Sequence, residues 1–159
     1  MSGLRIGLGV DAHAFADGVP LVLGGIRFAH PRGLAGHSDG DVITHALIDA
    51  VLGAAGLGDI GTLFPSDEST PAGIDSLVLL RDACARVRAA AYDIVNADCI
   101  LIGQEPRLAA RRQELERTLT DVVGAPVSVR ATTTDGLGFT GRGEGLAAQA
   151  VALLQLRLS

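Results

Sequence analysis

The stretch HSDGDVITH, residues 37–45, places a polar and acidic turn directly before a run of apolar residues. From Asp41 onward the apolar positions recur at helical spacing, which predicts a helix over 41–55. Asp39 and Asp41 are both suited to cap that helix, because an aspartate oxygen can accept from the free amides of a first turn. The chain is therefore best interpreted as a scaffold organised around this helix.

On the predicted helix Asp41, His45 and Asp49 are four residues apart and share one face, beside the apolar stripe. His45 is thus placed to hold a ligand while a carboxylate one turn away orients its second ring nitrogen. From this helix alone, a solvated histidine at the edge of the core is the alternative interpretation.

A second element supplies matching chemistry. The run Arg5–Val10 has the composition of a strand and is followed by Asp11 and His13, which point to the same side if the strand continues. With His45 they form an Asp/His/His set. Three such ligands suit a divalent cation such as zinc and leave a fourth position open for substrate, as in catalytic rather than structural sites.

Composition limits the classes of function. The chain has 159 residues, which predicts a single domain over 1–159, and 48% of them are hydrophobic while 3% are aromatic. The formal net charge is −5, and no basic stripe or set of stacking aromatic residues is present, so we expect no nucleic-acid partner.

The sequence also bears on compartment. Cys84 and Cys99 have no metal-binding or redox spacing and are interpreted as buried thiols. The segment Met1–Arg5 leads directly into the first strand, so we expect no signal or transit peptide. No apolar run approaches the length that spans a bilayer, about 20 residues. We therefore expect a cytoplasmic protein with no membrane contact.

Glycines and prolines divide the first half of the chain. Leu21–Ala29 reads as two short strands hinged at a Gly-Gly pair, after a loop at Phe15–Gly18, and His30 is expected to be exposed. The segment 56–71 is a long loop rich in turn formers. It is interpreted either as a ligand-binding loop, in which Asp59 accepts from sugar hydroxyls, or as a mobile acidic surface loop.

The second half continues the alternation of helices and strands. The predicted elements are a helix over 77–91 capped by Ser76, a strand over 94–102, a turn at 103–107, an amphipathic helix ending near Gly124 and a strand over 127–134.

The Gly- and Thr-rich segment 135–145 is expected to precede a last helix over 146–158. Its hydroxyls, amides and Arg142 suit an anion such as phosphate, although an ordinary strand-to-helix connection explains it equally. The last helix would be apolar on nearly every side, which predicts a homo-oligomer. The element order predicts an α/β (α+β) sandwich, with one mixed sheet and helices packed largely on one face.

Several stretches taken together resemble the 2-C-methyl-D-erythritol 2,4-cyclodiphosphate synthase family, in the right order along the chain. These stretches are Asp11–Phe15, His37–Asp41 with His45, Gly58–Gly61 with Leu63–Pro65, Ala131–Thr134 and Gly138–Gly145. The resemblance implies a homotrimeric enzyme of the non-mevalonate isoprenoid pathway. It would convert 4-diphosphocytidyl-2-C-methyl-D-erythritol 2-phosphate to the cyclic 2,4-diphosphate and release CMP.

The resemblance also implies roles for residues. Zinc would be held by Asp11, His13 and His45, and the transition state steadied by His37 and Thr133. The positions implied to bind substrate are Asp11, His13, His37, Ser38, Asp59, Ile60, Gly61, Phe64, Pro65, Ser66, Asp67, Glu68, Gly103, Gln104, Glu105, Pro106, Arg107, Leu108, Ala109, Thr132, Thr133, Thr134, Asp135, Phe139 and Arg142. Within this set Asp59 and Gly61 match the ribose site, 64–68 the methylerythritol loop and 103–109 the cytosine pocket. The residues of 132–135 would reach the phosphates from an adjacent subunit.

One departure from the family pattern concerns a second cation. Asp135 stands where the family commonly has Glu, at a position that helps to hold Mg²⁺ or Mn²⁺ between the α- and β-phosphates. Thr62 and Gly136 stand where lysine is frequent, so local positive charge is lower. Arg142 and Glu144 match residues of a cavity on the trimer axis, for which an isoprenoid diphosphate is the implied ligand.

Two rival functions fit the same residues. A zinc-dependent phosphohydrolase would use Asp41 or Asp49 to activate water. A non-catalytic trimeric module would use the metal only to hold the fold together.

Overall fold

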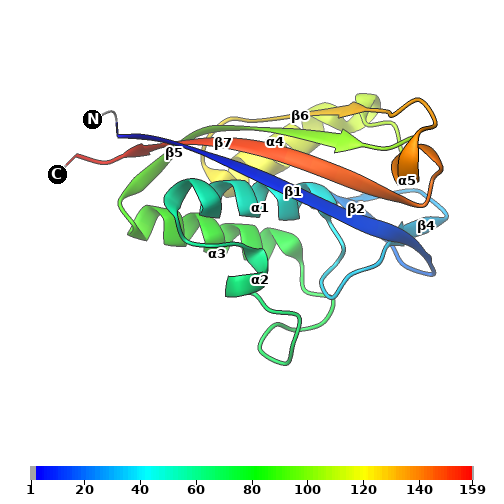
Figure 1. Ribbon diagram of the computed structural model, residues 1–159, viewed down its shortest axis with the longest axis horizontal. Coiled ribbons are helices and arrows are strands. Elements are labelled where there is room, and N and C mark those ends of the chain that lie inside the picture. The colour runs from blue at the N-terminus through cyan, green and yellow to red at the C-terminus, as the bar shows by residue number, and fades with distance from the viewer. Residues whose placement is uncertain (1–2, 159) are drawn as a thin grey trace.

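A computed structural model describes residues 3–158 of the protein. Its main feature is a five-stranded mixed sheet in the order β4-β1-β7-β5-β6, in which only β5 and β6 run parallel (Figure 1). The strands are β1 (Leu4–Asp17), β4 (Arg32–Leu34), β5 (Tyr92–Ile102), β6 (Val127–Thr132) and β7 (Gly145–Leu156). Met1 and Ser2 lie outside the described residues. They belong to the segment Met1–Arg5, for which no signal or transit peptide is expected.

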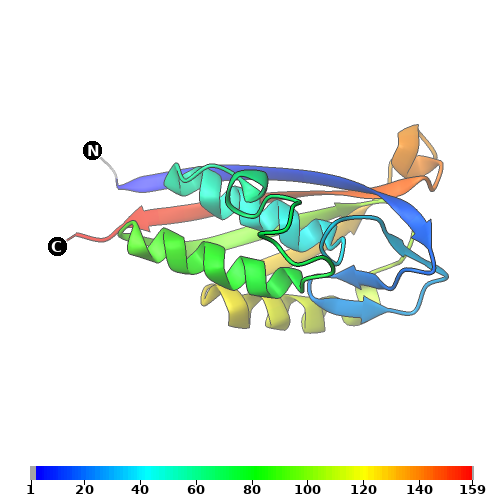
Figure 2. The ribbon, with the colours of Figure 1, turned by 90° about the horizontal axis from the view of Figure 1, so that it is seen from below.

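Three long helices cover one face of this sheet (Figure 2). They are α1 (Val42–Ala55), α3 (Ser76–Ala89) and α4 (Arg112–Val123). Three short elements lie in the connections: α2 (Ile60–Leu63) between α1 and α3, η1 (Ala109–Arg111) before α4, and α5 (Gly138–Gly141) between β6 and β7. The expected mixed sheet with helices on one face is confirmed. A separate two-stranded hairpin, β2 (Leu21–Leu23) and β3 (Ile26–Phe28), adds a second small sheet at the Gly-Gly hinge, as the sequence predicts.

Helix α1 is the central element, and Asp41 caps it. The Asp41 side chain is fully buried and accepts from the amides of Thr44, Gly24 and Gly25 at 3.0, 2.8 and 2.7 Å, and from the Thr44 hydroxyl at 2.6 Å. These bonds fasten the hairpin turn to the start of the helix. Of the two aspartates suited to cap the helix, Asp41 is the one that does so.

Glycines in β1 allow α1 to lie directly on the sheet. A Cβ on Gly9 would stand 1.8 Å from the carbonyl oxygen of Ala46, and one on Gly7 would stand 1.9 Å from that of Ala50. Gly7, Gly9 and Asp11 alternate along the strand and therefore face the same side. The close approach of α1 to this side brings its His45 next to the end of that row.

The prediction of a last helix over 146–158 is wrong, because this segment is the central strand β7. It pairs antiparallel with both β1 and β5, and its burial alternates. Leu146, Ala148 and Ala150 are buried under the helices, whereas Gln149 and Val151 are exposed on the other face. Because β7 has apolar residues on both of its faces, its sequence resembles that of a buried helix. The small residues at every second position fit a strand that lies beneath a closely packed helix.

Three smaller expectations also need correction. Phe15–Asp17 continues β1 instead of forming a loop. His30 is not exposed: its side chain is 9% exposed and stacks on Phe15 with ring centroids 5.4 Å apart. The helix expected over 77–91 begins at Ser76 and is capped by Asp75, so Ser76 is free for another role.

The remaining sequence predictions on the core agree with the structure. Cys84 and Cys99 are buried free thiols, and burial raises their pKa values to about 11 and about 12. Within residues 3–158 no helix is long and apolar enough to span a membrane.

The face of the sheet opposite the helices carries a row of exposed apolar side chains. Ile6, Leu8 and Val10 of β1 are 74%, 63% and 56% exposed, and Val151 of β7 is 45% exposed. This sheet face, and not a last helix, therefore carries the surplus of apolar surface that favours self-association.

Candidate metal centre and substrate pockets

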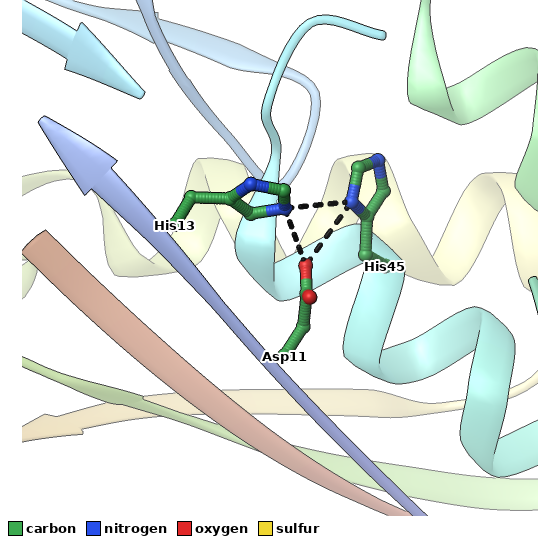
Figure 3. Close-up of side chains that lie close together, drawn as sticks. All are labelled: Asp11, His13 and His45. Carbon is green, nitrogen blue, oxygen red and sulfur yellow. Dashed lines mark hydrogen bonds and ion pairs between the residues drawn. The ribbon is translucent and has the colours of Figure 1, made fainter. Parts of the chain in front are cut away.

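Asp11, His13 and His45 converge at the point where β1 passes the first turn of α1 (Figure 3). Asp11 Oδ2 lies 2.7 Å from His13 Nε2 and 3.1 Å from His45 Nδ1, and the two ring nitrogens are 3.2 Å apart. The sequence-predicted set of three ligands is thus brought together by one strand and one helix.

Charge and burial shape the ionisation of this cluster. Burial opposes the charged form of Asp11, but its close contacts with His13 and His45 outweigh that effect and lower the Asp11 pKa to about 2. The hydrogen bond to Asp11 raises the pKa of His13 above its usual 6.5, against the effect of burial. Asp11 is therefore ionised near neutral pH and offers a carboxylate to a cation.

The donor set fits a divalent cation. One carboxylate oxygen and two imidazole nitrogens are ordinary zinc ligands, and tetrahedral zinc places ligand atoms about 3.3 Å apart. The three separations here, 2.7 to 3.2 Å, require only a small outward movement to reach that value.

The far nitrogen of His45 is held by serines, not by a carboxylate of its own helix. His45 Nε2 lies 2.9 Å from Ser38 Oγ and 2.8 Å from Ser76 Oγ. This corrects the expectation that Asp41 or Asp49 orients the ring. Sequence reasoning missed Ser76 because a serine before a helical pattern is normally explained as a cap.

The two carboxylates proposed for a rival hydrolase have other partners. The four donors around Asp41 occupy it at the cap of α1. Asp49 Oδ1 accepts from the amide of Ile60 at 2.7 Å, and its burial raises its pKa. Asp49 therefore fixes the start of α2, whose cap is Asp59.

A cavity of about 160 Å³ is lined by Asp11, His13 and His45, the candidate metal centre. His37 and Ser38 line it, and His37 Nε2 donates to the carbonyl of Thr70 at 2.6 Å. The predicted substrate residues that also line this cavity are Ile60, Gly61, Phe64 and Ser66. Asp59, Pro65, Asp67 and Glu68 belong to the same loop but do not line the cavity.

Most of the residues expected to form a cytosine pocket line a second and larger cavity of about 520 Å³. Its lining includes Gly103, Gln104, Pro106, Arg107, Leu108 and Ala109 together with Thr132 and Thr133. Glu105 does not line it and instead faces His30 Nε2 at 3.4 Å. Sequence reasoning did not single out Arg112 and Arg130, which line this cavity too.

Within one chain these two cavities are separate. Asp11, Ala148, Leu101 and Ala131 lie in one row across β1, β7, β5 and β6. Three strand spacings separate the ends of that row, about 14 Å. Thr133 is therefore not brought to the metal centre of its own chain.

The residues around α5 form a third group. The strand expected to reach 134 ends at Thr132, and Asp135 takes a left-handed conformation with φ 53° and accepts from the Thr133 hydroxyl at 3.2 Å. Thr134 bonds to Thr140 at 3.0 Å. The element that follows is the one-turn helix α5, and the long helix expected after this segment is strand β7.

Two exposed residues of this region were expected to line an axial cavity. Arg142 and Glu144 form an ion pair at 3.0 Å, near the exposed Phe139. None of these three residues lines either cavity described above.

A family model described as the YgbB family matches residues 4–155, nearly the whole of the described chain. The chain belongs to the YgbB family. A relative from Alkalilimnicola ehrlichii, named 2-C-methyl-D-erythritol 2,4-cyclodiphosphate synthase, is 53% identical over 156 residues, which cover 95% of this chain and 94% of that protein.

Solved structures share the fold of this chain. The bifunctional IspDF of Campylobacter jejuni matches with a TM-score of 0.94 and 37% identity over 99% of this chain and 43% of that chain. This chain thus spans less than half of that bifunctional protein. The CDP complex of IspF from Plasmodium falciparum matches with a TM-score of 0.85 and 32% identity over 99% of both chains.

Proposed function

We propose that this chain converts 4-diphosphocytidyl-2-C-methyl-D-erythritol 2-phosphate to 2-C-methyl-D-erythritol 2,4-cyclodiphosphate and releases CMP, as a cyclising phosphorus–oxygen lyase of isoprenoid biosynthesis. The strongest support for this proposal is that Asp11, His13 and His45 converge in one cavity with His37. The named relative at 53% identity and the CDP-bound structure support a cytidine-linked diphosphate as substrate.

The residues Asp11, His13 and His45 would hold the first cation, for which the donor set favours Zn²⁺. Bound there, the metal would supply Lewis-acid polarisation of the β-phosphate. Asp135 would help to hold Mg²⁺ or Mn²⁺ with the diphosphate, and its short side chain favours contact through water.

The chain's own task is to position the substrate. The attacking 2-phosphate is already an anion near neutral pH, so the reaction requires no dedicated general base. The protein must fold the substrate into an in-line arrangement, exclude water and neutralise phosphate charge. Thr133 would steady the transition state by donating a hydrogen bond, worth about 2.7–4 kcal/mol when well placed. His37 would do so through Nδ1, because its Nε2 already donates to Thr70.

We further propose a homotrimer with active sites between subunits. The separation of about 14 Å between the ends of the row across the sheet keeps Thr133 away from its own metal centre, so a neighbouring chain would supply 132–135. The exposed row of Ile6, Leu8 and Val10 supplies the apolar surface that such an assembly would bury. Arg142 and Glu144 would then lie near the trimer axis and bind an isoprenoid diphosphate.

Product analysis tests the activity directly. Purified protein is incubated with the substrate and divalent cations, and the products are resolved by phosphorus NMR. Ring closure yields CMP and a cyclic diphosphate, whereas a phosphohydrolase yields only open-chain products, which would contradict the proposal.

Two variants test the rival function, a non-catalytic trimeric module in which the metal only holds the fold together. Asp11→Ala and His45→Ala should remain folded trimers without activity, because the core does not depend on the cluster. If these variants lose both the trimer and the activity, the metal has a structural role instead.

A further inference from the structure

The second ring nitrogen of His45 is bound to Ser76, a residue that has no part in the proposed reaction. Ser76 Oγ, at the first residue of α3, lies 2.8 Å from His45 Nε2 and also contacts Asp39 Oδ1. The Ser76 side chain is fully buried, and its backbone amide donates to the other Asp39 oxygen at 2.9 Å.

The direction of these hydrogen bonds is fixed by proton counting. An ionised carboxylate only accepts, so the single hydroxyl proton of Ser76 is donated to Asp39. Toward His45 the same oxygen can only accept. A ring proton on His45 Nε2 satisfies this oxygen, and Nδ1 then has its lone pair directed at Asp11 and His13.

Both serine oxygens lie within hydrogen-bond distance of Nε2, so either can accept its proton. The two serine contacts at Nε2 measure 2.9 and 2.8 Å, whereas the Nδ1 contact to Asp11 measures 3.1 Å. Ser38 is the weaker determinant, because its hydroxyl proton is not bound to a carboxylate and can turn either way. Ser76 is therefore the member of the network with a fixed polarity.

We propose that Ser76 is a positioning residue of the metal centre, which holds His45 as the Nε2–H tautomer so that Nδ1 is available to a cation. This inference rests on the metal site of the proposed function. It also makes Asp39 part of that site, as the group that orients the Ser76 hydroxyl. Partners of this kind, which bind a ligand and not the metal, are typically worth about 10- to 100-fold in metal affinity.

The first measurement is of the tautomer itself. Long-range ¹H–¹⁵N spectra of metal-stripped protein at pH 8, with its 4 histidines labelled, distinguish the two neutral forms of each ring. Wild type should show His45 as the Nε2–H form, and Ser76→Ala should shift it toward a mixture. A wild-type ring protonated at Nδ1 would overturn the inference.

The second measurement is of Zn²⁺ affinity by competition with a chromogenic chelator. Ser76→Ala should bind about 10- to 100-fold more weakly. Asp39→Asn keeps the shape but lets its amide donate to Ser76, which turns the hydroxyl proton toward Nε2, so it should also weaken zinc binding. Unchanged affinity in both variants would overturn the inference.

Thr44→Val is the matched control. Thr44 precedes His45 on α1, is fully buried and donates its hydroxyl to Asp41 at 2.6 Å, so the variant loses a comparable buried hydrogen bond away from the ring. It should lose stability but keep wild-type zinc affinity. Equal losses of affinity in Thr44→Val and Ser76→Ala would mean that Ser76 acts only through stability.

The inference and the proposed function fail separately. Protein that binds zinc through a Ser76-dependent His45 but forms no cyclic product contradicts the function and supports the inference. If the wild-type protein forms the cyclic product and Ser76→Ala keeps its zinc affinity, the function is supported and the inference is contradicted.

Discussion

The amide of Ile60 donates to Oδ1 of Asp49 at 2.7 Å and thereby ties α2 to the helix that carries His45. Asp49→Ala should free the start of α2 and raise KM, while the zinc affinity stays near that of wild type. Asp49→Asn keeps an acceptor oxygen and should retain cyclisation. Steady-state kinetics of both variants check this.

The same pair of variants addresses the hydrolase alternative. A general base cannot be replaced by an amide, so an inactive Asp49→Asn with unchanged KM would favour a water-activating role for Asp49.

Gly9→Ala should displace α1 from the sheet. The added methyl would meet the Ala46 carbonyl at 1.8 Å, and relief of that clash would cost about 1–3 kcal/mol and move His45 from Asp11. Denaturant unfolding and zinc competition should both show a loss. Gly53→Ala on α1 has open space around its added methyl and should gain about 0.5–1 kcal/mol. Comparable losses in both variants would contradict this account.

The ion pair at the metal centre predicts a pH dependence in metal-stripped protein. The His13 pKa is raised above 6.5, so its contribution to stability is complete below pH 6.5 and is lost as pH rises through the raised value. The Asp11 pKa is lowered from 3.8 to about 2, so its contribution is complete above pH 3.8 and is lost toward pH 2. The Tm difference between wild type and His13→Gln should therefore be greatest between these two limits. A difference that stays constant up to pH 9 would contradict it.

Asp135→Glu should keep activity within tenfold, a change of about 1.4 kcal/mol. The longer side chain reaches farther toward a cation, whereas the φ of 53° favours Asp over Glu at this position. Activity titrated against Mg²⁺ checks the balance: a loss above tenfold would mean that the site is built around the short side chain.

Much of this fold can be predicted from sequence, because short stretches such as a helix with its cap are specified by their own residues. The apolar spacing after Asp41 and the αL glycine that ends α1 at Gly56 specify that helix without tertiary information. Strand β7 is different. Its Ala and Leu residues favour a helix, and the partners β1 and β5 that make it a strand lie far away in the sequence.

The candidate site also has one part that the sequence predicts and another that only the structure shows. The alternation of Gly7, Gly9, Asp11 and His13 along one strand face can be read from sequence. The bond from His45 to Ser76 joins residues 31 positions apart and depends on how α3 packs beside α1. Sequence spacing therefore suggested an orienting group on the same helix, whereas the structure supplies it from another.

The separation of the two cavities within one chain has a genetic consequence. If neighbouring subunits share each site, a chain defective at His45 and another defective at Thr133 can complement each other when co-expressed. In randomly mixed trimers about a quarter of the sites would receive both intact halves. Two alleles that are each lethal alone would then sustain growth together.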